Sequence, residues 1–94
     1  MLYTIKQSPF SHQALVQALA LMQPDDRLLL WQDAVIGATV SQWLSLLQPL
    51  AATGRLYVMQ EDLQARGLTH QVGEMICMAD WVRLVAEWGS PQAW

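Results

Sequence analysis

The sequence predicts an α/β fold: a small three-layer domain spanning residues 1–94, with helices on both faces of a mostly parallel sheet of about four strands. Three observations predict it. Strand-like and helix-like segments alternate, the links between them are short, and residues 27–32 form an apolar run typical of a strand buried on both faces. Because helical links carry the chain back across the sheet, neighbouring strands are expected to be parallel. A chain of 94 residues has room for one core.

The order of the elements follows from hydrophobic spacing and from residues that start or end helices. Segments rich in aliphatic and aromatic residues are predicted strands: residues 2–6, 27–32, 55–59 and 75–79. Segments with apolar residues at helical spacing are predicted helices: residues 12–22, 41–48, 60–67 and 81–88. Ser11, Ser41 and Asp80 are the expected N-caps, and Gly67 is the expected C-cap of the third helix. A loop is expected around Asp33, and the last residues are expected to form a short tail.

The composition is short of charge. Charged residues make up 14% of the chain, against about 25% in typical soluble domains, while 53% of the residues are apolar. A small domain has much surface for its volume, so apolar side chains are expected to stay exposed unless another chain covers them. Depletion of charge is typical of interface cores, and we therefore expect a subunit of a larger assembly. The alternative is a rich core under an uncharged surface that the eleven glutamines supply.

Charge and hydropathy also exclude classes of protein. The net charge is −3 and the five basic residues are scattered, so direct binding of nucleic acid is not expected. The opening "MLYTIKQS" is typical of a strand rather than a signal peptide, and no apolar stretch is long enough to span a membrane. A single cysteine cannot form an internal disulfide, which fits a reducing compartment. We expect a cytoplasmic protein that binds no membrane.

Polar residues at the carboxyl ends of the predicted strands are candidates for a site, because ligands of open α/β sheets bind at that edge. They are Ser8, Asp33, Gln60, Glu61, Asp62 and Asp80, with Cys77 just inside the end of its strand. The chain has no glycine-rich phosphate motif, and His12, His70 and Cys77 show no metal-ligand spacing, so neither a cofactor nor a metal is expected. Helix capping and helix-dipole interactions explain the four acids, and the two histidines are expected at the surface.

Cys77 lies in the apolar run at residues 75–78, where a cysteine usually behaves as a small buried hydrophobe. A reactive thiol needs a nearby cation or a helix N-terminus, and here Asp80 adds negative charge beside it. We therefore expect a structural role for Cys77 and no catalytic residue in this chain. Two alternatives stay open: an enzyme, namely a sulfurtransferase that uses the Cys77 thiol, and a homo-oligomer with a regulatory or storage role.

Five motifs occur in an order that resembles one family. They are "SPF", "LLLWQDAV", "LYVMQEDLQARGL", "MADWVRLV" and a final "QAW". Together they resemble the TusB/DsrH family of the DsrE/DsrF/DsrH-like group over essentially the whole chain, with "EDLQARGL" and the terminal "AW" the most specific. The resemblance implies a heterohexamer, a dimer of heterotrimers, with TusC-like and TusD-like sister chains. Such complexes pass persulfide sulfur from a TusA-like to a TusE-like protein for 2-thiolation of the tRNA wobble uridine. The related alternative is a DsrH subunit of a DsrEFH complex in sulfur oxidation.

The resemblance also implies that the position that carries the relayed sulfur in a sister chain is vacant here. In the TusD-like sister the carrier cysteine lies where the third strand meets its helix, and the matching position here is Met59, whose thioether cannot form a persulfide. Members of the DsrH branch often have a cysteine in the first helix, at the position of Ala18 here, and its lack favours the tRNA-thiolation branch. The candidates for the subunit interface are Trp81, Trp88, Trp94 and Met59, with the last helix and the tail expected to contact partners first.

Overall fold

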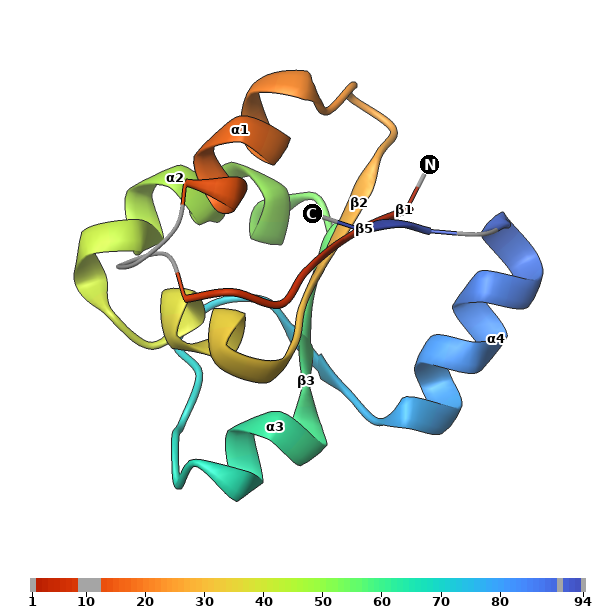
Figure 1. The fold of residues 1–94 in the computed structure, drawn as a ribbon. Coiled ribbons are helices and arrows are strands. Elements are labelled where there is room, and N and C mark those ends of the chain that lie inside the picture. The colour runs from red at the N-terminus through yellow and green to blue at the C-terminus, as the bar shows by residue number, and fades with distance from the viewer. Residues whose placement is uncertain (1, 9–12, 90, 94) are drawn as a thin grey trace.

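The computed structural model describes residues 2–8, 13–89 and 91–93 (Figure 1). The strands are β1 (Leu2–Ile5), β2 (Arg27–Leu30), β3 (Leu56–Met59), β4 (Glu74–Ile76) and β5 (Gln92–Ala93). The helices are α1 (Ala14–Leu21), the 3₁₀ helix η1 (Gln32–Ala38), α2 (Ser41–Ala52), α3 (Gln60–Ala65) and α4 (Met78–Trp88). All strand pairs are parallel, in the order β4-β3-β2-β1-β5. The predicted α/β fold is confirmed, with five strands in place of about four.

Helices cover both faces of the sheet unequally, with α1, α2 and η1 on one face and α4 on the other (Figure 1). The central strand β2 shows the consequence. Leu28 and Leu30 pack into the larger core under α1 and α2, whereas Leu29 packs into the smaller core with Trp81 of α4. Because side chains alternate between the faces, a strand covered on both sides is apolar at successive positions, as residues 28–30 are.

The last helix begins earlier than predicted. β4 ends at Ile76 and α4 begins at Met78, so Cys77 is the N-cap and not a strand residue. Asp80 is the third residue of the helix, and the prediction that it is the N-cap is wrong. The apolar run hides this boundary because Met78 and Ala79 already belong to the first turn of α4.

Two further boundaries differ because tertiary contacts decide them. The expected loop around Asp33 is the 3₁₀ helix η1, whose N-cap is Trp31, so Asp33 lies in the first turn and is not a cap. Part of the expected tail forms β5, in which Gln92 and Ala93 pair with β1. Two residues carry too little pattern to predict a strand when their partner lies at the other end of the chain.

Helix α2 is longer than the predicted residues 41–48 and continues through Pro49 to Ala52. Pro49 and Ser45 are both exposed, so water can satisfy the Ser45 carbonyl that the proline leaves unbonded. The N-cap of α2 is Val40 with no side-chain cap, so the prediction of Ser41 as the cap is also wrong. Three predicted residues, Ser11, His12 and Trp94, lie outside the described residues.

Candidate functional site

The carboxyl edge of the sheet is organised by the short helix α3, which follows directly on β3. Its two acids accept hydrogen bonds from the starts of two neighbouring helices. Glu61 Oε2 lies 3.0 Å from the backbone nitrogen of Met78, the first residue of α4. Asp62 Oδ2 lies 2.7 Å from the backbone nitrogen of Gln32, the first residue of η1. Since the first N–H groups of a helix have no partner within it, α3 satisfies one such group on each side.

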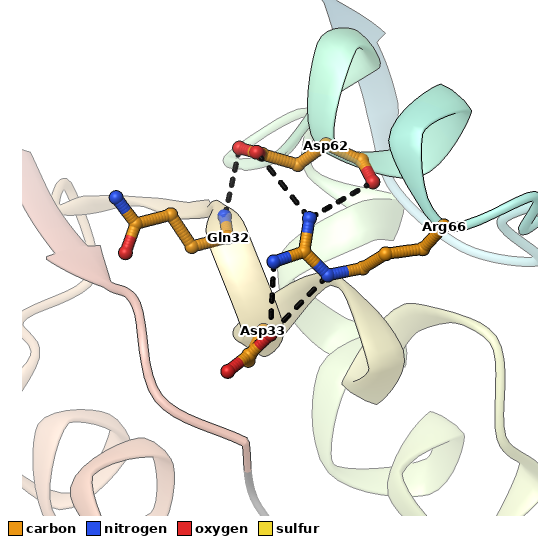
Figure 2. A network of polar contacts seen from close by, with 4 residues as sticks. All are labelled: Gln32, Asp33, Asp62 and Arg66. Atoms are coloured by element: carbon orange, nitrogen blue, oxygen red, sulfur yellow. Dashed lines mark hydrogen bonds and ion pairs between the residues drawn. The ribbon is translucent and has the colours of Figure 1, made fainter.

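Arg66 completes a polar network between α3 and η1 (Figure 2). Its Nη2 lies 2.8 Å from Asp33 Oδ1, and its Nη1 lies 3.5 Å from Asp62 Oδ1. Arg66 Nη1 also donates to the backbone oxygen of Asp62 at 3.3 Å. The Asp33 side chain is 64% exposed, and ion pairs in water contribute little, so the network positions α3 more than it stabilises the fold. The Asp33 and Asp62 carboxylates of this edge thus have structural partners.

Gln32 is the only non-glycine with a positive φ in the part of the chain that the structure describes, at 51°. This left-handed conformation turns the chain from β2 into η1. It costs an ordinary residue about 1–2 kcal/mol, which the hydrogen bond to Asp62 helps to offset. The sequence gives little sign of this, because glycine is the residue that usually indicates such a turn.

Met59 ends β3 and is the N-cap of α3. Its side chain has 0% exposure and packs in the smaller core beside Ile76 and Trp81. A buried thioether is neither a nucleophile nor accessible to one. The strand-to-helix junction of β3 therefore offers no reactive group at this position.

The Cys77 thiol is half-buried at the start of α4 and forms a capping box with Asp80. Its sulfur accepts a hydrogen bond from the backbone N–H of Asp80 and lies 3.3 Å from Asp80 Oδ2. The same carboxylate oxygen accepts the backbone N–H of Cys77 at 3.2 Å. The Cys77 N–H, the Cys77 thiol and the Arg83 guanidinium together lower the pKa of Asp80 below its ordinary value, against a smaller opposing effect of burial. The acid beside Cys77 is therefore held in its charged form.

The sequence matches a known family over most of its length. The model of the DsrH-like protein family matches residues 7–90. The chain belongs to the DsrH-like family. It is 36% identical to Protein TusB of Klebsiella pneumoniae subsp. pneumoniae over 98 aligned residues, 37% identical to that of Escherichia coli K12 over 98, and 34% identical to that of Pectobacterium parmentieri over 97. Each alignment covers the whole of both chains, and the resemblance in the sequence motifs is confirmed.

The interface candidates of this DsrH-like chain differ in exposure. Trp81 is 8% exposed and belongs to the smaller core, as does the fully buried Met59. Trp88 is 42% exposed, and its ring lies 4.4 Å from the guanidinium carbon of Arg27. Arg27 also donates a hydrogen bond to the hydroxyl of Tyr57, so Trp88 is fixed against the amino end of the sheet. Of the described candidates, Trp88 alone offers a large exposed surface.

The remaining predicted residues of the DsrH-like chain do not gather into one site. Ser8 and Gln60 are half-buried near the carboxyl edge. His70 is half-buried and lines an open hollow of about 300 Å³ with Gln48 and Gln71, and Cys77 is not among the residues that line it. Among the described residues, no three His, Cys, Asp or Glu side chains could hold a metal ion. No helix in the described ranges is long and apolar enough to cross a membrane.

Proposed function

We propose that the chain is a non-catalytic subunit of a TusBCD-type sulfur relay complex. In it, a TusC-like and a TusD-like sister chain join this chain in a heterohexamer in the cytoplasm. The complex passes persulfide sulfur from a TusA-like protein to a TusE-like protein, and the sulfur ends in the 2-thiouridine of the tRNA wobble position. Membership of the DsrH-like family and full-length similarity to proteins named TusB support this function.

The observation that carries the non-catalytic role is the side chain at the end of β3. Sulfur transfer needs a thiolate that can attack and accept a persulfide sulfur. Met59 holds that junction with a fully buried thioether. A subunit with this residue can shape and complete an assembly, while a sister chain supplies the attacking cysteine.

A second candidate function is a sulfurtransferase that uses Cys77. The observation in its favour is the position of the thiol at the N-terminus of α4, where the sulfur accepts the Asp80 N–H. The Asp80 carboxylate, 3.3 Å from the same sulfur, opposes it, because a second negative charge beside a carboxylate is unfavourable. The geometry thus favours a capping role for Cys77 over a nucleophilic one.

The test of the proposed function is the composition of the native assembly. A mild tagged purification from the native cells should recover this chain with two sister chains in equal amounts, identified by mass spectrometry and sized as a heterohexamer. Recovery of this chain alone, as a monomer or a homo-oligomer, would overturn the proposal and make Cys77 the next residue to examine.

A further inference from the structure

The two helices of one layer carry no charge at all. The chain has five Lys and Arg and eight Asp and Glu residues, yet none lies between Lys6 and Asp25 or between Asp33 and Arg55. These two stretches contain α1 and α2, which together cover one face of the sheet (Figure 1). A helix with one side in water normally carries charged residues there. On the opposite layer, α4 does so, with Asp80, Arg83 and Glu87.

A shallow apolar groove of about 400 Å³ lies between α1 and α2. We call it the α1–α2 groove, and its lining includes Leu19, Met22, Leu46, Pro49, Leu50 and Arg55. The Arg55 guanidinium is already bonded to the carbonyls of Gln23 and Asp26 and to the Thr53 hydroxyl. The uncharged lining is therefore the part of the groove that is open to a partner.

Exposed branched side chains lie on both helices that flank this groove. Leu46 is 47% exposed on α2. Val16 is 48% exposed on α1, three residues before Leu19 and therefore on the same side of that helix. Apolar side chains exposed on two adjacent helices form a broad surface rather than a slot for an extended peptide, and ridges of one helix pair are complementary to the groove of another.

We infer that the α1–α2 groove binds an uncharged, apolar helix face of a sister chain. The inference rests on the proposed function and adds the surface and the chemistry of the contact. A positively charged partner face is disfavoured because the lining residue that carries a charge is the cationic Arg55, and a negatively charged face would have to compete with the carbonyl and hydroxyl partners that Arg55 already has. Either face would bury a poorly paired charge, which is unfavourable. An uncharged apolar face meets no such cost, and charge depletion with good packing is typical of interface cores.

The test introduces one positive charge at the groove and one beside it. Leu46→Lys places an ammonium at the groove, and Gln48→Lys places the same group two residues later, on another side of α2. Both positions are exposed, so both variants should keep the wild-type circular dichroism and melting temperature. Binding of each purified chain to the co-expressed pair of sister chains is then measured by titration. Leu46→Lys should weaken the affinity by about 30-fold or more, and Gln48→Lys by less than about threefold.

Each outcome decides the matter. If Leu46→Lys binds the sister chains as tightly as the wild type does, the α1–α2 groove is not the binding surface. The proposed function then stays intact. Failure of the wild-type chain to bind the sister chains overturns the proposed function and the inference with it. If the wild-type chain forms a homodimer and Leu46→Lys dissociates it, the groove binds a second copy of this chain. That result would overturn the inference that a sister chain occupies the groove.

Discussion

Asp62 Oδ2 accepts a hydrogen bond of 2.7 Å from the backbone N–H of Gln32, thirty residues earlier in the chain. The bond joins α3 to the start of η1 at the residue with a φ of 51°. The turn that leads out of β2 therefore depends on a side chain of the helix that follows β3. Glu61 acts in the same way on α4, so one short helix fixes the starts of two others.

Replacing Asp62 should destabilise the fold. Asp62→Ala removes the acceptor for the Gln32 N–H and one partner of Arg66, and we expect the free energy of unfolding at pH 7 to fall by about 1–2 kcal/mol. Asp62→Asn keeps an oxygen acceptor and should lose less. Urea unfolding measures both, and Gln64→Ala, an exposed change on the same helix, is the control. Equal losses for Asp62→Ala and Gln64→Ala would contradict the account of this bond.

Gln32→Gly should stabilise the protein relative to Gln32→Ala. Both variants lose the same side-chain amide, but only glycine adopts a φ of 51° without steric cost. The Gly variant should exceed the Ala variant by about 1 kcal/mol in the free energy of unfolding, measured in urea. A more stable Ala variant would show that Gln32 is not strained in solution.

Much of the fold could be predicted because the pattern of burial is visible in the sequence. Residues 28–30 are apolar at every position since both faces of β2 are covered, and the helices that link successive strands indicate parallel neighbours. Strand β5 could not be predicted, because its two residues are ordered by pairing with β1. The start of η1 could not be predicted either, because the Gln32 N–H at that position donates to Asp62, which belongs to a different segment.

Stability should depend on pH through Asp80. The Cys77 N–H, the Cys77 thiol and Arg83 lower the pKa of Asp80 in the folded chain. The stability that the ionised carboxylate contributes to the fold is therefore fully present above the unfolded pKa of about 4. The contribution is lost as the pH falls through the lower folded pKa. Asp80→Asn should therefore be less stable than the wild type at pH 7, and the difference should shrink between pH 4 and pH 2. Urea unfolding at both ends of this range measures it.

Asp25→Asn is the matched control for this pH dependence, because it removes one carboxylate from an exposed turn. Its effect on the free energy of unfolding is measured at the same pH values and subtracted from the effect of Asp80→Asn. Asp26 also has a lowered pKa: burial opposes its ionisation, and the Gln23 N–H at 2.8 Å is first among the interactions that together outweigh that effect. The wild type therefore keeps some acid sensitivity even when Asp80 is replaced. A pH-independent difference for Asp80→Asn would count against the capping box.

Two substitutions of Cys77 distinguish its role as the N-cap of α4 from a role of its thiol in sulfur transfer. Serine is a good N-cap, so Cys77→Ser should keep the stability of α4 within about 0.5 kcal/mol, whereas Cys77→Ala should lose about 1 kcal/mol. Sulfur transfer by the assembled complex should be largely intact with Cys77→Ser. Thermal unfolding and a transfer assay with the complex measure the two effects. A stable Cys77→Ser chain whose complex no longer transfers sulfur would point to a reactive thiol.

The candidate site was less predictable than the fold. The acids at the carboxyl edge were identified from the sequence, but as caps and dipole partners of their own helices. The structure shows that Glu61 and Asp62 bond to other helices, and that Cys77 rather than Asp80 is the N-cap of α4. These hydrogen bonds join residues 17 and 30 positions apart, so they depend on how the segments pack. The local sequence pattern does not indicate them.

The central claim is that this chain belongs to a sulfur relay without carrying sulfur itself. It is tested most directly by loading the complete complex with radioactive persulfide sulfur from a TusA-like donor, followed by alkylation and mass spectrometry of every chain. We predict the label on a cysteine of a sister chain and none on Cys77. A persulfide on Cys77 that is passed on to the TusE-like acceptor would contradict the claim.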